Sequence, residues 1–189
     1  MMNIEDLQYA ITKISLYDDQ SYFEKIYVDY YNKLFRLSLS IVKSEVIAEE
    51  VYDDVMLNIW EKRKQLSEIN NFTVYLYVSV KNASLRYLSR SSKMSNVDIN
   101  DITIDIEDLT PTAHERLIAI EFMDKINSVI AQLSPQCKLV FKLVKEDGLK
   151  YKEVAEILDI SVKNVEYHMG NALKKISTTI SSDKFFLIK

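Results

Sequence analysis

The sequence has 189 residues, of which 48% are hydrophobic and 28% are charged, enough to build one ordinary domain or two small ones. Only two glycines and two prolines occur, which argues against turn-rich β folds and phosphate-binding glycine loops and predicts an all-α fold. The formal net charge of −4 at pH 7 argues against strong unaided binding to nucleic acid, because neutralisation of phosphates dominates that affinity.

The single cysteine and the apolar runs set expectations about the compartment. Cys137 cannot form an internal disulfide, which fits a reducing cytosol, and its apolar neighbours favour a buried structural thiol. No apolar run approaches the ~18 residues of a membrane span. The acidic start of the chain lacks the positively charged leader of a secretory signal. We therefore expect a cytoplasmic protein without membrane insertion.

The distribution of charge divides the chain. Acidic residues concentrate in the N-terminal tail 1–21, with one base and four acids, and in the segment 93–113, with one base and five acids. The blocks on either side of the second segment are slightly basic. We expect a three-helix domain over 20–92, an extended acidic linker over 93–112 and a four-helix domain over 113–180. Apolar residues at period two in the linker suggest an extended strand-like segment that could lie in a groove.

The first block predicts three helices, over 22–42, from a Ser44 cap to about residue 64, and from Asn70 or Asn71 to about residue 90. The second helix places Ile47, Ala48, Val51, Val55 and Ile59 on its core face. Its opposite side mixes acids with Met56, Leu57 and Trp60, which a purely solvated face would not expose together. Either this helix is sandwiched within its own domain or it binds a partner through an acidic, apolar-studded surface.

The third helix of this block is apolar on nearly all sides and also carries bases. Aromatic side chains beside bases are typical of a platform for single-stranded nucleic acid. Core packing is the alternative, and it is favoured for Phe72 more than for Tyr75 and Tyr77, whose hydroxyls require water or a partner.

The second block predicts helices over 113–133, from a Ser134-Pro135 start to Asp147-Gly148, over 150–158 and over 162–178. The last two have the spacing of a helix-turn-helix, the DNA-binding motif whose second helix enters the major groove. Ala155 is small enough for a close helix crossing, and Asp159 stands where the turn requires a left-handed residue. Ile160 and Val165 are expected to fill the angle between the helices, and Ser161 to cap the second one.

The last helix separates into two faces at about 100° per residue. Its predicted core face carries Val165, Met169, Ala172 and Ile176. Its opposite face is rich in hydrogen-bond donors that read base edges and bind phosphates, although a merely solvated face is the alternative for the lysines. Gly170 lies on this face, either to admit the DNA backbone or as a tolerant surface position. The predicted DNA-binding residues are Lys163, Asn164, Tyr167, Asn171, Lys174 and Lys175.

No catalytic or metal-binding constellation can be assembled from these residues. Two histidines, His114 and His168, and one cysteine give no recognisable ligand spacing. We expect no enzyme activity, no metal and no cofactor.

The motifs in these blocks, taken in order, resemble regions 2 and 4 of a sigma factor with only a linker between them, as in the compact extracytoplasmic-function class of the sigma-70 family. The region 2 resemblance rests on 22–31, 47–60 and 71–82, and the region 4 resemblance rests on 133–135, 148–155 and 161–172. Three positions depart from the family's usual residues: Asp53 replaces a common glutamine, Tyr75 a frequent tryptophan and Asn164 a usual threonine.

This resemblance implies a transcription initiation factor that binds bacterial core RNA polymerase and promoter DNA, with an anti-sigma factor as a further candidate partner. The second helix would dock on the coiled coil of the polymerase clamp through Glu49, Glu50, Asp53, Asp54, Leu57 and Trp60. The 66–72 loop and the third helix would melt the −10 element and hold a flipped base through Asn70, Asn71, Tyr75, Tyr77, Lys81, Asn82 and Arg86. The helix-turn-helix would read the −35 element, and the acidic linker would run toward the RNA exit path.

Two other readings of the sequence are open. A regulator of the response-regulator type shares a similar C-terminal motif, but it would not need the blocks 47–60 and 72–82. A helical interaction protein without DNA function would leave the donor-rich face of the last helix without a purpose.

Overall fold

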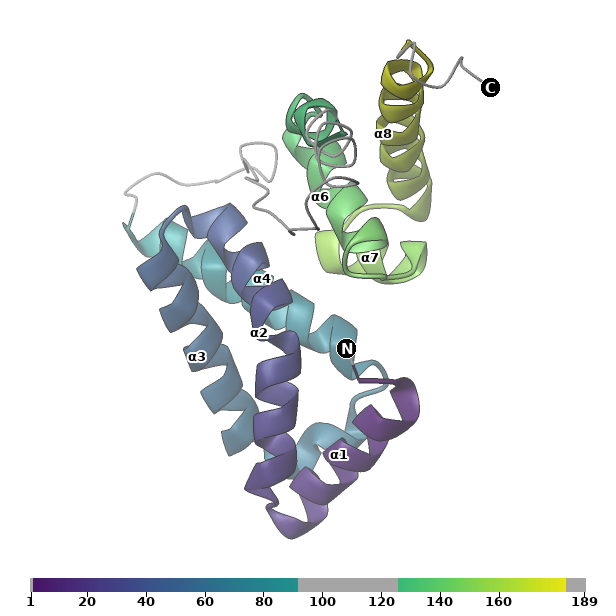
Figure 1. Cartoon of the computed structure of the whole chain (residues 1–189). Helices are drawn as coiled ribbons and strands as arrows, with labels where there is room; N and C mark the ends of the chain where they lie inside the picture. The colour runs from purple at the N-terminus through teal and green to yellow at the C-terminus, as the bar shows by residue number, and fades with distance from the viewer. Residues whose placement is uncertain (1, 92–125, 183–189) are drawn as a thin grey trace, which may run out of the picture. The chain divides into compact units, whose positions relative to one another are not determined.

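The computed structural model describes residues 2–91 and 126–182, and every regular element in these ranges is a helix (Figure 1). The chain divides into two compact units, residues 1–97 and 98–189, described separately below. The predicted all-α class is confirmed. The predicted linker 93–112 and the start of the helix expected over 113–133 lie outside the described residues.

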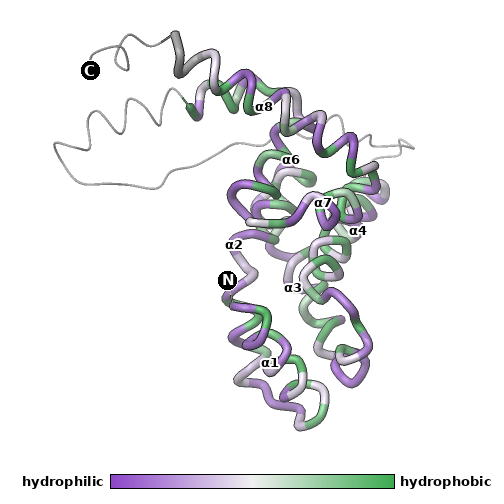
Figure 2. Tube along the Cα trace, turned by 90° about the vertical axis from the view of Figure 1, so that its right-hand side faces the viewer, coloured by the Kyte–Doolittle hydropathy of each residue, from purple (hydrophilic) through white to green (hydrophobic). Residues whose placement is uncertain are grey.

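Unit 1 contains four α-helices and one 3₁₀ helix within its described part. They are α1 (Ile4–Tyr17), α2 (Gln20–Val42), α3 (Glu45–Glu61), the 3₁₀ helix η1 (Arg63–Glu68) and α4 (Phe72–Ser91). The helices α2, α3 and α4 pack against one another, and α1 packs against α2 and η1. Hydrophobic and hydrophilic residues alternate along these helices, as expected when each buries one face (Figure 2).

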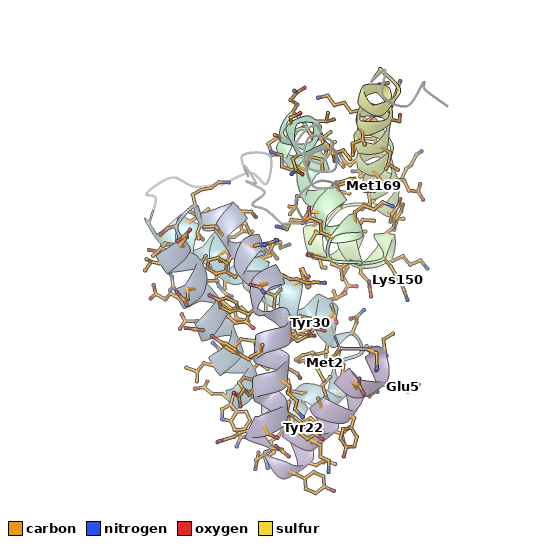
Figure 3. All side chains as sticks on the ribbon, viewed as in Figure 1. Met2, Glu5, Tyr22, Tyr30, Lys150 and Met169 are labelled. Carbon is orange, nitrogen blue, oxygen red and sulfur yellow. The ribbon has the colours of Figure 1, made fainter. Side chains whose placement is uncertain are left out.

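The core of unit 1 combines apolar packing with buried hydroxyl pairs. Tyr30 of α2 is fully buried (Figure 3), and its hydroxyl lies 2.7 Å from the hydroxyl of Thr73 on α4. Ser38 and Ser84 form a second buried pair between the same helices, with 3.0 Å between their oxygens. Because a buried hydroxyl without a partner is costly, these pairs fix the register of α2 on α4.

The helix α1 falls in the segment that the charge pattern treated as a tail. Asn3 caps it by accepting a hydrogen bond from the backbone of Asp6, and Ala10, Ile11 and Ile14 are buried. It ends at Asp18, which adopts the left-handed conformation that aspartate tolerates. The tail is therefore part of the domain.

Unit 2 contains α6 (Pro135–Lys145), α7 (Tyr151–Leu158) and α8 (Val162–Ser182), preceded by helical residues 126–131. The side chain of Ser134 caps α6, with proline at its start, as the sequence predicts. Gly148 has a φ of +77°, which glycine adopts without strain. No helix within the described parts of the chain is both long and apolar enough to cross a membrane.

Cys137 is buried, as expected, and its Sγ lies 3.2 Å from Nδ1 of His168 on α8. Burial lowers the pKa of His168 below its ordinary 6.5. The unfolded chain therefore takes up this proton first as the pH falls, so the contribution of His168 to stability is present above pH 6.5 and is lost below it.

We expect acidification from pH 7 to about 5.5 to lower the free energy of unfolding of unit 2. The change should be smaller in His168→Gln, which cannot titrate in this range. Urea unfolding at several pH values, followed by a probe in unit 2, measures both chains. Equal pH dependence in the two chains would contradict the assignment.

Candidate nucleic-acid and partner interfaces

The turn between α7 and α8 has the geometry of a helix-turn-helix. Asp159 ends α7 with φ 56° and ψ 46°, the left-handed conformation that the sequence predicts. The hydroxyl of Ser161 accepts a hydrogen bond from the backbone N–H of Asn164 at 3.1 Å, which caps α8. Val165 is fully buried between the helices, Ala155 is also buried, and Ile160 is half-buried.

The helix α8 presents the predicted faces. Met169 (Figure 3), Val165 and Ala172 are buried, and Ile176 packs at the edge of the core. The opposite face is exposed, including Tyr167 at 66%, and a Cβ added to Gly170 would meet no atom within 4 Å. The exposed residues of this face are Lys163, Asn164, Tyr167, Gly170, Asn171 and Lys174.

Lys175 differs from its neighbour Lys174 although both are exposed. The ammonium of Lys175 donates a hydrogen bond to the carbonyl of Gln132 at 2.7 Å, just after the helical residues 126–131. This hydrogen bond links α8 to the end of the helical segment 126–131. Its predicted role in DNA binding stays a prediction.

The outward face of α3 is acidic with one exposed leucine. Glu49, Glu50, Asp53 and Asp54 are exposed, and Leu57 is 57% exposed. Trp60 is half-buried. Met56, which the periodicity places on this outward face, is instead 1% exposed. The reason is that α3 packs against both α2 and α4, which widens its buried arc.

A groove of about 580 Å³ lies between α2 and α3, and two of these acids, Asp53 and Asp54, line it. Phe23, Met56, Leu57 and Trp60 supply apolar surface, and acids lie at its border. The complete lining is Gln20, Phe23, Glu24, Tyr27, Asp53, Asp54, Met56, Leu57 and Trp60. An apolar floor with an acidic border suits a partner that offers an apolar side chain next to basic ones.

Tyrosines of α2 bind two of the acids of α3. The hydroxyl of Tyr27 donates to Oδ1 of Asp53 at 2.6 Å, and the hydroxyl of Tyr31 donates to Oε1 of Glu49 at 3.3 Å. Burial, aided by the neighbouring Asp53 carboxylate, raises the pKa of Tyr27 to about 12. The phenol therefore stays protonated, and remains a donor, at neutral pH.

Trp60 is held on two sides. Its ring lies 5.0 Å from the ring of Phe23, and the guanidinium carbon of Arg63 lies 4.7 Å from its centroid. Arg63 also forms an ion pair with Asp18, at the end of α1, and this hydrogen bond holds the pKa of Asp18 below its ordinary value. Arg63, at the start of η1, thus connects Trp60 of the groove with the end of α1.

A second cavity, of about 290 Å³, lies between η1 and α4. It is lined by Lys62, Gln65, Leu66, Glu68, Ile69 and Tyr75. Of the residues predicted to contact the −10 element, Tyr75 is half-buried at this cavity, and the exposed ones are Asn70, Asn71, Asn82 and Arg86. The side chain of Asn71 also caps α4, by accepting from the backbone of Val74 at 3.1 Å.

Tyr77 and Lys81 do not lie with this exposed set. Tyr77 is 0% exposed and Lys81 is 9% exposed, so both belong to the interior of unit 1. The sequence pattern of α4 is apolar on nearly all sides and could not separate its inner from its outer residues. Conversely, Tyr27, Phe23 and Arg63 were not predicted as site residues. The aromatic pairs in 22–31 were the available signal, but their partners on α3 cannot be read from the sequence.

No cluster of three or more potential metal ligands occurs within 2–91 and 126–182. The two cavities described above offer apolar and charged surface on which a partner can bind.

Comparison with known families identifies both units. A family model described as Sigma-70 region 2 matches residues 26–94, and one described as Sigma-70, region 4 matches residues 123–176. The chain is also similar to the ferric citrate uptake sigma factor FecI of Escherichia coli (strain K12). The two are 22% identical over 152 residues, which cover 80% of this chain and 87% of that protein.

Two solved structures share the fold. The structure of CnrH in complex with the cytosolic domain of CnrY has a TM-score of 0.56 and 19% identity, and the match covers 94% of this chain and 99% of that one. The sigma factor RpoE in complex with the anti-sigma factor NepR, from Bartonella quintana, has a TM-score of 0.56 and 15% identity, over 85% and 98% of the two chains.

Proposed function

Because the chain belongs to the sigma-70 family, and within it to the extracytoplasmic-function class, we propose specific roles for the surfaces described above. The protein is a transcription initiation factor that directs RNA polymerase to promoters. A regulator acting beside another sigma factor is not favoured, because such a protein would not need the residues matched by the region 2 model. The observation that carries the assignment is the presence of both regions, in order, in one chain.

The groove between α2 and α3 is the proposed docking site for the polymerase. Asp53 and Asp54 at its border, together with the exposed Glu49 and Glu50 of the same helix, would attract basic side chains of the polymerase clamp, and Leu57 with Trp60 would contact an apolar one. Steering by opposite charge would speed the encounter, and the apolar contact would slow dissociation.

The cavity between η1 and α4 is the proposed site for a base flipped out of the −10 element. Tyr75 offers a ring for stacking, and Leu66 and Ile69 offer apolar surface, which is what enzymes and factors that hold a flipped base require. The exposed Asn70, Asn82 and Arg86 would contact the neighbouring single strand. The buried Tyr77 and Lys81 are left out of this proposed surface.

The exposed face of α8 is the proposed reader of the −35 element. Lys163, Asn164 and Tyr167 lie near its N-terminal end, where a recognition helix reaches base edges. Asn171 and Lys174 follow one to three turns later, where a recognition helix leaves the DNA major groove and approaches the phosphate backbone. Lys175 is a secondary candidate, because its ammonium already binds Gln132.

We propose further that an anti-sigma factor can occupy these same surfaces in the absence of the polymerase. The support is that the fold is shared with a sigma factor solved in complex with an anti-sigma factor. Sigma factors are not enzymes, and we propose that this chain has no catalytic activity and acts in the cytoplasm, where the polymerase is.

Binding to core polymerase tests the proposed function. The full chain is immobilised and exposed to purified bacterial core polymerase, with the full chain of an unrelated helix-turn-helix protein as the control. Retention of the polymerase by this chain alone is the expected result. Absence of any binding would refute the proposal.

Gly170 gives a prediction that separates protein stability from DNA binding. Alanine at this position has room for its Cβ and should stabilise the helix by about 1 kcal/mol. If the DNA backbone approaches this face closely, the same methyl group should weaken binding to the −35 element. Thermal unfolding and promoter binding of Gly170→Ala measure the two effects. Unchanged promoter binding would show that the glycine only occupies a tolerant position.

A further inference from the structure

Two phenol–carboxylate pairs connect α2 to α3 along the acidic face. Tyr27 pairs with Asp53 and Tyr31 with Glu49, at 2.6 and 3.3 Å. The two tyrosines are four residues apart on α2, and the two acids are four residues apart on α3, so the pairs lie one helical turn from each other. The Tyr27–Asp53 pair lies at the groove, since both residues line it.

The position of Tyr27 is set by its own packing. Its ring lies 5.0 Å from the ring of Tyr52 and 6.2 Å from that of Tyr31. The buried hydroxyl of Tyr52 donates to the backbone carbonyl of Tyr27 at 2.6 Å, which also fixes the main chain at this residue. The phenol therefore has a defined place that does not depend on Asp53.

Asp53, in contrast, is an exposed side chain on the outer face of α3. An exposed aspartate ordinarily samples several rotamers and loses that freedom when a partner binds. Here Oδ1 accepts the hydrogen bond from Tyr27, while the described residues donate no hydrogen bond to Oδ2. The fixed phenol thus orders the carboxylate and leaves one oxygen for an incoming cation.

We propose that Tyr27 is a positioning residue that holds the Asp53 carboxylate at the border of the groove, ready to accept a hydrogen bond from an arginine or lysine of the polymerase. This inference rests on the proposed docking of the polymerase at this groove. Asp53 stands where the family commonly has glutamine, so the Tyr27–Asp53 pair would give this chain a charged contact that a glutamine does not make.

A double-mutant cycle on polymerase binding tests the proposal. The full chain, Tyr27→Phe, Asp53→Ala and the double variant are each titrated against core polymerase. We expect Asp53→Ala to weaken binding about 10-fold and Tyr27→Phe about 3-fold. If the phenol acts through the carboxylate, Tyr27→Phe should have no further effect in the Asp53→Ala chain. Tyr17→Phe, which removes the hydroxyl of an exposed tyrosine of α1, is the control and should bind as the unaltered chain does.

Other outcomes overturn the proposal in distinguishable ways. If the effects of Tyr27→Phe and Asp53→Ala add independently, or if Tyr27→Phe binds normally while Asp53→Ala is impaired, Tyr27 does not position Asp53. If Asp53→Ala and the charge reversal of Glu50 and Asp54 all bind normally, the polymerase docks elsewhere and the proposed function of the groove fails with it. Thermal unfolding of each variant separates lost binding from lost folding.

Discussion

Replacing both Glu50 and Asp54 with lysine is expected to weaken binding to core polymerase by about 100-fold or more. Both carboxylates are exposed on the outer face of α3, and Asp54 lines the groove. Lysines there would face the basic groups expected on the polymerase, and like charges placed together in an interface cost several kcal/mol. Because neither side chain contributes to the core, the fold should be preserved. The measurement is a titration against core polymerase, accompanied by a circular dichroism spectrum and a thermal melt.

A matched control isolates the position of the charge from its amount. Glu5→Lys with Asp6→Lys changes the net charge equally on exposed residues at the start of α1. We expect this control to bind polymerase within a few-fold of the unaltered chain, since charges far from an interface are largely screened at physiological salt. An equal loss of polymerase binding in the two double variants, or normal binding of Glu50→Lys with Asp54→Lys, would refute the groove between α2 and α3 as the docking site.

Replacing Asn164 with alanine is expected to cost about 1–3 kcal/mol at one base pair of the −35 element and to relax the preference there. The backbone N–H of Asn164, and not its side chain, binds the capping Ser161, so the substitution should leave the helix start intact. Replacing Lys174 should instead weaken all sequences alike and lower the salt slope by about one unit, as expected for one lost phosphate contact. Binding of the holoenzyme to a randomised −35 element, at several salt concentrations, measures both.

Lys175→Ala is the neighbouring comparison. Its ammonium binds the carbonyl of Gln132, so its removal should lower the stability of unit 2 more than it changes DNA binding. If Lys174→Ala altered the base preference while Asn164→Ala left it unchanged, the proposed placement of α8 in the DNA major groove would be wrong.

Local rules were sufficient where neighbours in the sequence decide the structure. The left-handed Asp159, the Ser161 cap and the proline start of α6 depend on residues within one turn, and all are found as predicted. The two faces of α8 also follow from its periodicity, because only one side of this helix packs against the other helices of unit 2. The start of α1 had a comparable signal in its Asn3 cap and in the spacing of Ala10 and Ile14, which the high acid content of the tail obscured.

The burial and contacts of the remaining residues depend on tertiary packing. Met56 faces inward because α3 is covered by two helices, and a periodicity that assumes one buried face cannot show this. Tyr77 and Lys81 lie on a helix whose sequence is apolar on nearly all sides, so no exposed face could be assigned to them. The Tyr27–Asp53 bond joins residues 26 positions apart, and it exists only because α2 and α3 pack at a particular angle and register.

Transcription by the reconstituted holoenzyme tests the central claim most directly. Core polymerase, free of other sigma factors, is mixed with the full chain and a library of genomic promoter fragments, and run-off transcripts are sequenced. We predict transcripts from a defined set of start sites preceded by two common sequence elements. They should be lost with the Glu50→Lys/Asp54→Lys variant and redistributed among promoters with Asn164→Ala. Polymerase that gives no transcripts above the core enzyme alone, or the same transcripts with every variant, would contradict the account.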